Sequence, residues 1–131
     1  MEKELGSGAF GFVYLYKHQT QPDKKLAIKV ENASKLGKYG SVMTKESYYL
    51  RMMNDKKCDR VIGYYGDGFW QGVQYMKIEY LDMTLEAYLE DPKILNKISV
   101  SQIACQMLEC LKQMHKAGYI HQDVKPDNFM I

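Results

Sequence analysis

Residues 121–128 read His121-Gln122-Asp123-Val124-Lys125-Pro126-Asp127-Asn128, a mostly polar octet that follows a long helical pattern. It fits H-x-D-x-x-x-x-N, a spacing that fixes a carboxylate and an amide five residues apart. In isolation the octet is equally well read as a polar turn after a helix, with Pro126 as the helix breaker. The residues upstream have to decide between these two interpretations.

A glycine cluster lies near the start of the chain, Gly6-Ser7-Gly8-Ala9-Phe10-Gly11, and fits G-x-G-x-x-G. Glycines let the backbone approach a phosphate closely, and backbone N–H groups can then face the anion. A glycine-containing hairpin turn is the plain alternative. A dinucleotide fingerprint is another, because Glu31 lies about 20 residues on, but that motif needs a helix at the glycines. Residues 12–16 instead have a strand pattern, and no helix fits before Leu26, so the cluster is predicted to join two strands.

The strand predicted over residues 26–31 carries the next candidate. Alternation places Ala27, Lys29 and Glu31 on one face, with Leu26, Ile28 and Val30 on the other. A small residue beside a lysine fits a nucleotide site, since the small residue leaves space for a flat base and the lysine can bind its phosphates. A surface lysine on an exposed strand face would give the same sequence pattern.

The helix predicted over residues 41–53 supplies a partner for Lys29. Glu46 falls within an apolar stripe formed by Val42, Tyr49, Leu50 and Met53. A carboxylate there is costly unless it is paired, so we expect an ion pair with Lys29. The alternative is that Glu46 lies at the edge of the stripe and reaches water.

The remaining pattern predicts an α+β protein, a β-rich part followed by helices. Strands are predicted at 61–65 and 74–81, with turn residues Gly66-Asp67-Gly68 and Gln71-Gly72 between them, and a short helix from Thr84 through Glu90. A long helix is predicted over 100–116, with a capping box at Ser99 and Gln102 and a C-terminal cap at Gly118. Its apolar stripe is predicted to be core: Ile103, Met107, Cys110, Leu111 and Met114.

Composition leaves room for one domain. The 131 residues carry a net charge of only +2, which does not favour nucleic acid or a membrane as the main partner. No long apolar stretch opens the chain, so no signal peptide is predicted. The three cysteines, Cys58, Cys105 and Cys110, have no metal-ligand spacing, which favours reduced thiols and a cytoplasmic or nuclear location.

Together, the glycine loop, Lys29, Glu46 and the octet resemble eukaryotic protein kinases, and they occur in the same order. Lys125, two residues after Asp123, resembles the serine/threonine kinases. The glycine loop and residues 45–53 and 124–129 resemble casein kinase I, and the resemblance covers essentially the whole chain. It implies the protein kinase fold, with the N-lobe at 1–79 and the hinge and start of the C-lobe, through the catalytic loop, at 80–131.

The resemblance also implies ATP and Mg²⁺ as cofactors and a protein Ser or Thr hydroxyl as acceptor. Asp123 would accept the hydroxyl proton, Lys125 would neutralise the transferring phosphoryl group, and Asn128 would bind the metal. The hinge is expected near 79–81, with Ile78 guarding the back of the pocket. The implied ATP-binding residues are Leu5, Gly6, Ser7, Gly8, Ala9, Phe10, Gly11, Val13, Ala27, Lys29, Glu46, Glu79 and Leu81.

Two departures from the family stand out. Gln122 replaces an arginine that normally tethers the activation loop, so regulation through a phosphorylated loop is doubtful. The D-F-G motif is expected downstream of Ile131, so we expect these 131 residues alone to be inactive or nearly so. The alternatives are a pseudokinase or scaffold that binds nucleotide without transfer, and a small-molecule phosphotransferase, which Lys125-Pro126 disfavours.

Overall fold

The computed structural model describes residues 3–8, 11–18, 20–21, 23–31, 41–90 and 99–131. The chain divides into two compact units, Met1–Tyr80 and Leu81–Ile131, and each is described here by itself. No helix in these described ranges is long and apolar enough to cross a membrane.

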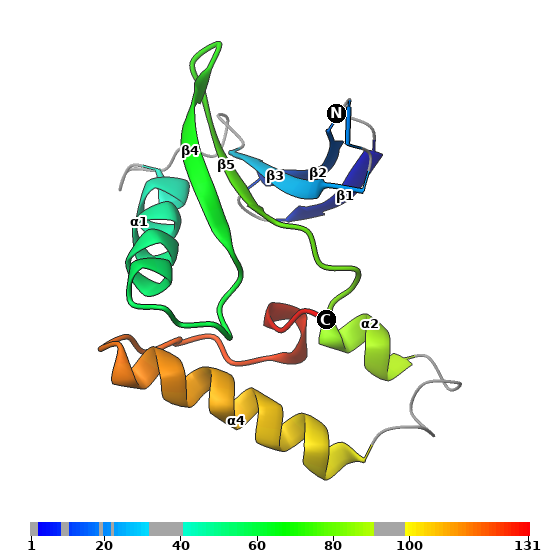
Figure 1. The fold of residues 1–131 in the computed structure, drawn as a ribbon, viewed down its shortest axis with the longest axis vertical. Helices are drawn as coiled ribbons and strands as arrows, with labels where there is room; N and C mark the ends of the chain where they lie inside the picture. Colours follow the sequence, from blue (N-terminus) through cyan, green and yellow to red (C-terminus); the bar gives the residue numbers. More distant parts are fainter. Residues whose placement is uncertain (1–2, 9–10, 19, 22, 32–40, 91–98) are drawn as a thin grey trace. The chain divides into compact units, whose positions relative to one another are not determined.

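The first unit is built on a five-stranded antiparallel sheet with the order β1-β2-β3-β5-β4 (Figure 1). Its strands are β1 Lys3–Gly8, β2 Gly11–Lys17, β3 Lys25–Glu31, β4 Tyr64–Trp70 and β5 Val73–Glu79. Strand β3 lies in the middle, because it pairs with β2 on one side and with β5 on the other. The central strand is therefore the one that carries Ala27, Lys29 and Glu31.

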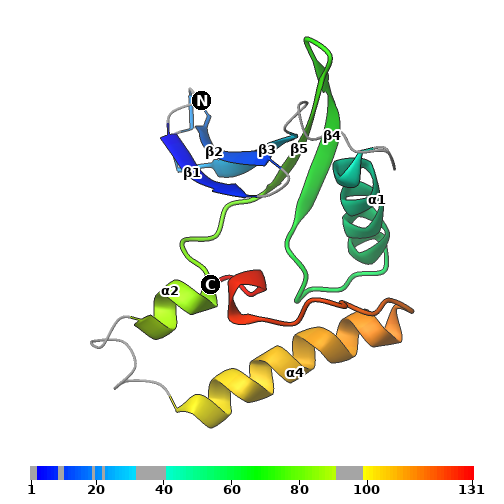
Figure 2. The ribbon, with the colours of Figure 1, turned by 180° about the vertical axis from the view of Figure 1, so that it is seen from behind.

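Among the described residues of this unit one helix, α1 (Val42–Asp55), accompanies the sheet and packs beside β4 and β5, as the two opposite views in Figures 1 and 2 show. Ser41 is its N-cap, and its hydroxyl accepts a hydrogen bond from the Thr44 N–H at 3.0 Å. At the other end the Asn54 amide donates to the carbonyls of Leu50 and Ile62, and its oxygen accepts from the Tyr64 N–H at 3.0 Å. Side-chain hydrogen bonds thus fasten α1 at both ends.

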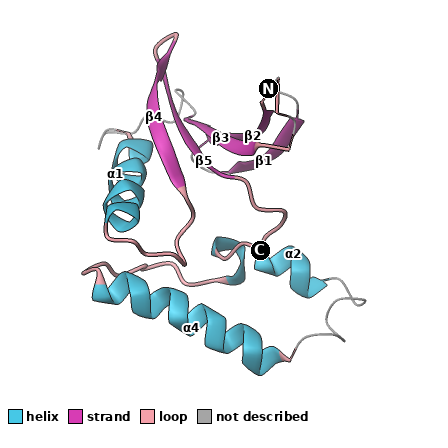
Figure 3. Cartoon of the chain, in the orientation of Figure 1, coloured by secondary structure: helices cyan, strands magenta, loops and turns pink. Residues whose placement is uncertain are grey.

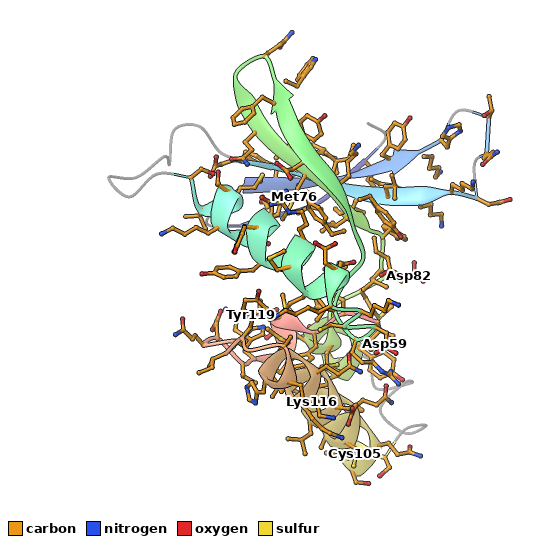
Figure 4. All side chains as sticks on the ribbon, turned by 60° about the vertical axis from the view of Figure 1, so that its left-hand side comes forward. Asp59, Met76, Asp82, Cys105, Lys116 and Tyr119 are labelled. Atoms are coloured by element: carbon orange, nitrogen blue, oxygen red, sulfur yellow. The ribbon has the colours of Figure 1, made fainter. Side chains whose placement is uncertain are left out.

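The apolar stripe predicted for α1 is partly wrong. Its buried residues are Met43, Ser47 and Met53, whereas Val42 and Tyr49 are exposed. The inward face is therefore rotated relative to the prediction, toward Met43. Fully buried Met76, on β5 and labelled in Figure 4, belongs to the same core.

The prediction for β4 is wrong in its boundaries. The strand covers Tyr64–Trp70 instead of 61–65, so Gly66 and Gly68 lie inside it and do not form a turn. The register shifts between Tyr64 and Gly66, so that Tyr65 has no Cα partner on β5, and this β-bulge includes Gly66, whose φ is 118°. The turn lies at Gln71 and Gly72, both with positive φ, as expected for a tight two-residue hairpin.

The second unit contains α2 (Leu85–Glu90), α4 (Val100–Lys116) and the short 3-10 helix η2 (Pro126–Asn128), shown among its loops in Figure 3. The predicted caps are confirmed. The Thr84 hydroxyl accepts from the Ala87 N–H, and the Gln102 side chain accepts from the Ser99 N–H. At the end of α4, Gly118 has φ of 91°.

The end of α4 is a Schellman motif. The Gly118 N–H donates to the His115 carbonyl at 2.9 Å, and the Tyr119 N–H donates to the Met114 carbonyl at 3.0 Å. These bonds satisfy carbonyls that a helix end leaves open, and they turn the chain sharply toward residues 121–128.

The interpretation of the α4 stripe as core is wrong for the described residues. No α4 side chain is fully buried: Ile103, Met107, Cys110, Leu111 and Met114 are all half-buried, and Val100 and Leu108 are exposed. The bounds of the helix, by contrast, are as predicted. Cys105 and Lys116, labelled in Figure 4, lie on this helix, and Cys105 is exposed.

Candidate active site

The predicted glycine loop joins β1 and β2, as the strand pattern indicated. The two strands pair down to Gly8 and Gly11, and the tip residues Ala9 and Phe10 lie outside the described residues. Leu5 falls at an irregularity in the register between Glu4 and Gly6 and is exposed. The dinucleotide alternative requires a helix after Gly11, and the structure has β2 there.

The glycines differ in what surrounds them. A Cβ on Gly11 would lie 2.1 Å from the Val30 carbonyl oxygen, so the close approach of β3 requires glycine at this position. A Cβ on Gly6 would meet nothing within 4 Å. Packing among the described residues therefore explains why position 11 needs glycine, but it gives no reason for glycine at position 6.

The predicted ion pair between β3 and α1 is present. Lys29 Nζ lies 2.7 Å from both carboxylate oxygens of Glu46, and the two side chains are 22% and 35% exposed. Neither residue is near the other in sequence, so the pair forms only because β3 and α1 pack as they do. The pair fixes the ammonium group while leaving part of it accessible.

Ala27 is buried beside Lys29 on the same strand. It pairs with Leu15 of β2 and with Ile78 of β5, and Val13 of β2 pairs with Lys29. Thus Val13, Ala27 and Ile78 come from three adjacent strands, with Ala27 on the middle one. The predicted hinge residues fall on either side of the unit boundary, Glu79 in the first unit and Leu81 in the second. The Glu79 N–H donates to the Gly63 carbonyl at 2.8 Å, and Glu79 pairs with Leu26 of β3 at the end of β5.

In the second unit, α2 holds the segment that follows residues 121–128. The Leu85 N–H donates to the Phe129 carbonyl at 2.7 Å, and Thr84 and Met130 form a β-bridge. Both views of the ribbon show α2 beside this segment (Figures 1 and 2). The candidate catalytic residues therefore lie between two fixed points, the end of α4 and the contact with α2.

The three candidate catalytic and metal-binding side chains lie together. The Asn128 amide nitrogen donates to the Asp123 carbonyl at 2.8 Å and to its carboxylate at 3.0 Å, and Lys125 Nζ lies 3.2 Å from the same carboxylate. The hydrogen bond from Asn128, followed by the one from Lys125, holds the pKa of Asp123 below its ordinary value of 3.8. All three groups are exposed, and Asp123 is ionised at neutral pH.

The residues before Asp123 shape its backbone. Gln122 has φ of 65°, in the left-handed region that a side chain with a Cβ rarely adopts. The His121 ring stacks on Phe129, with ring centroids 6.4 Å apart and planes 6° apart, and its Nδ1 accepts from the Asp123 N–H. This ring contact closes the loop on itself around the candidate residues.

Asp127, inside the octet, has a second carboxyl as its neighbour. Its hydrogen bond with Glu86 of α2, together with the like charge, raises the pKa of Glu86 above its ordinary value of 4.5. This contact ties η2 to α2 and favours the protonated form of the Glu86 carboxyl.

The donors present fit a magnesium ion only in part. Within the described residues, both side-chain hydrogen bonds of Asn128 use its amide nitrogen, so its amide oxygen remains as a hard oxygen ligand of the kind that Mg²⁺ prefers. No cluster of three or more His, Cys, Asp or Glu suited to a metal occurs within the ranges that the structure describes. Asn128 can therefore contribute one ligand.

Sequence reasoning missed the role of Glu31, which it weighed only as a dinucleotide acid. Glu31 is 9% exposed, and its carboxylate accepts from the Ser41 hydroxyl at 2.8 Å and from the Met43 N–H at 3.3 Å. The pattern did contain a clue, because alternation places Glu31 on the same face as buried Ala27. A buried acid needs partners, and the start of α1 was the nearest source of donors.

Comparison with known proteins identifies the class. The family described as "protein kinase domain" matches residues 1–131, the whole chain. The chain therefore belongs to the protein kinase domain family, which agrees with the antiparallel sheet, helix α1 beside it and the start of a helical part.

Individual relatives come from several branches of that family. The chain is 29% identical over 98% of its length to a probable casein kinase I homolog of Encephalitozoon cuniculi, and 27% identical over 97% to the serine/threonine-protein kinase unc-51 of Caenorhabditis elegans. It is 31% identical over 99% to the cell division cycle 7-related protein kinase of Homo sapiens. It spans 39%, 15% and 22% of these relatives, respectively.

Proposed function

We propose that this chain is the ATP-binding and catalytic-loop part of a serine/threonine protein kinase, which transfers the γ-phosphate of ATP to Ser or Thr hydroxyls of proteins. The observation that carries the proposal is the group formed by Asp123, Lys125 and Asn128. Kinase relatives whose names specify serine/threonine support the acceptor class, and so does lysine at position 125.

Each residue has a role that fits its surroundings. In the first unit, Lys29 is held by Glu46 and would bind the α- and β-phosphates, while buried Ala27 leaves room for the adenine. The open space around Gly6 supports a role for the glycine loop, including Ser7 and Gly8, in covering the phosphates. The backbone groups of Glu79 and Leu81 would grip the adenine.

In the second unit, Asp123 is ionised and would accept the proton of the acceptor hydroxyl. Lys125 would neutralise charge on the phosphoryl group as it moves, which is the main electrostatic requirement of this chemistry. Asn128 would hold, through its amide oxygen, a magnesium ion that neutralises phosphate charge. Regulation through a phosphorylated activation loop is not part of the proposal, because Gln122 cannot grip a phosphate as arginine does.

Within the kinases, we favour a casein kinase I-like enzyme. Two supports are the probable casein kinase I homolog of E. cuniculi and a putative casein kinase I of C. elegans among the relatives. Relatives from other branches have similar identity, so the acceptor preference has to be measured. Peptides with acidic or pre-phosphorylated residues before the acceptor serine, compared with neutral ones, make that measurement.

The test is phosphate transfer from ATP·Mg to casein by the full-length protein. We expect transfer to serine or threonine, reduced about 100-fold or more in Asp123→Asn because the proton acceptor is lost. Asp23→Asn is the matched control, since it removes an exposed carboxylate between β2 and β3, and it should leave the rate unchanged. Binding of ATP without transfer would instead support the pseudokinase alternative.

A further inference from the structure

A polar network joins the end of β3 to the start of α1, beside the Lys29–Glu46 pair. The Ser41 hydroxyl lies 2.8 Å from Glu31 and 2.7 Å from the side-chain oxygen of Gln74 on β5, and the Thr44 hydroxyl donates to the same Gln74 oxygen at 2.8 Å. Glu31 and Gln74 are both buried. The network also lines a cavity of about 110 Å³ between these elements.

Glu31 lies outside α1 and provides a hydrogen-bond acceptor for the first turn of the helix. Ser41 accepts from the Thr44 N–H, and Glu31 accepts from the Met43 N–H, so two of the N–H groups that a helix leaves open have partners. The negative charge of Glu31 also lies at the end of the helix where an anion is favoured. A helix normally takes its N-cap acceptor from the residue that precedes it, as α1 does with Ser41. The second acceptor, Glu31, comes from a strand of the sheet and therefore adds a constraint on the position of α1.

The same strand holds the same helix at two points. Lys29 and Glu31 lie two residues apart on one face of β3, so their positions differ by roughly 7 Å along the strand. Their partners, Glu46 and Met43, lie three residues apart, or about 4.5 Å along α1. A helix held at one point can turn about it, whereas a second point fixes the direction in which Glu46 faces.

We propose that Glu31, acting with Ser41, is a positioning residue for phosphoryl transfer: it fixes the first turn of α1 to β3 and thereby keeps Glu46 on Lys29. The proposal rests on the proposed function, because Lys29 has a catalytic role only in a kinase. Groups inside the first unit would thus keep Glu46 on Lys29. A phosphorylated loop is not expected to contribute, because Gln122 lacks the guanidinium that would hold it.

A double-mutant cycle in the full-length protein tests this inference. The variants are Glu31→Ala, Glu46→Gln and the combination, with kcat/KM for ATP·Mg as the readout. Each single substitution should lower kcat/KM about tenfold, since each removes a hydrogen bond to a charged group. If Glu31 acts through Glu46, the combination should lose little more than one substitution does.

Additional variants separate positioning from simple loss of stability. Glu31→Gln keeps an acceptor oxygen and should restore most of the activity, and Ser41→Ala, which keeps the contact of Glu31 with Met43, should give an intermediate loss. Ser47→Ala is the matched control, because Ser47 is buried on the same helix and donates to the Thr44 carbonyl within that helix. It should behave as the wild type.

The outcomes are distinct. Losses that multiply to about 100-fold in the combination would overturn the positioning role, because independent structural damage is additive in free energy. So would an unchanged rate in Glu31→Ala or in Ser41→Ala. A wild-type protein that neither binds ATP nor transfers phosphate would overturn the proposed function itself, before any variant is compared.

Discussion

Replacing Gly11 and Gly6 separately with alanine distinguishes packing from ligand binding at the glycine loop. At Gly11 the added Cβ would lie 2.1 Å from the Val30 carbonyl oxygen, whereas real contacts of this kind stay beyond 3.0 Å. The paired strands β2 and β3 would have to separate by the difference, 3.0 − 2.1 = 0.9 Å. At Gly6 the same methyl group enters open space.

The two variants should therefore fail in different assays. Gly11→Ala should lower the free energy of unfolding by about 1–3 kcal/mol, the usual cost of an overpacked site. Gly6→Ala should change stability by less than about 0.5 kcal/mol. If ATP phosphates come close to Gly6, however, the methyl group should weaken ATP·Mg binding about tenfold or more.

Urea unfolding followed by circular dichroism gives the first quantity, and calorimetric titration with ATP·Mg gives the second. Unchanged stability in Gly11→Ala would refute the steric argument. Unchanged ATP affinity in Gly6→Ala would refute the assignment of this glycine to the nucleotide site, whatever happens at Gly11.

Three further predictions follow from hydrogen bonds in the two units. Asn54→Ala should destabilise the first unit by roughly 1–3 kcal/mol, since the Ile62 carbonyl and the Tyr64 N–H lose the side chain that joins them to α1, and hydrogen exchange of that helix measures this. Burial, and then the hydrogen bond with Asp67, raise the pKa of Tyr64 to about 12. The ultraviolet titration of Tyr64→Phe should therefore lack one phenol near that pH. The contribution of the Tyr64 phenol to folding stability is present below about pH 10 and is lost as the pH rises through the folded-state pKa. Asn128→Ala should raise the pKa of Asp123 toward 3.8, as carbon NMR would show. In the wild type, the lowered pKa of Asp123 adds folding stability above pH 3.8, and this stability is lost as the pH falls through the folded-state pKa.

The sequence predicts the Lys29–Glu46 pair because two independent patterns meet there. Strand alternation gives the face of Lys29, and the helical period puts Glu46 near the apolar side of α1, where pairing lowers the cost of a carboxylate. The octet at residues 121–128 favours the pair over a carboxylate that reaches water at the edge of the stripe. The class of fold follows from the same patterns together with the ordered motifs. The bounds of α4 follow from its caps, since Ser99 and Gly118 each have a local physical reason to end a helix.

Other features depend on contacts that a single sequence does not contain. Gly66 and Gly68 look like turn residues, yet both pair with residues of β5 within a strand, beside a bulge at Tyr65. Similarly, the inward face of α1 is chosen by the sheet, which accepts Met43 and leaves Val42 exposed. The network at Glu31 needs three separate segments, and only the fold brings Ser41 and Gln74 to it.

The left-handed backbone at Gln122 sets the substitutions that this position can tolerate over evolutionary time. Glycine or asparagine could enter at little conformational cost, whereas valine, isoleucine and threonine would be penalised by their branched Cβ atoms. An exchange between arginine and glutamine leaves that cost nearly unchanged, since both are unbranched at Cβ. Drift at position 122 can therefore remove or restore a charge beside Asp123 without rebuilding the loop.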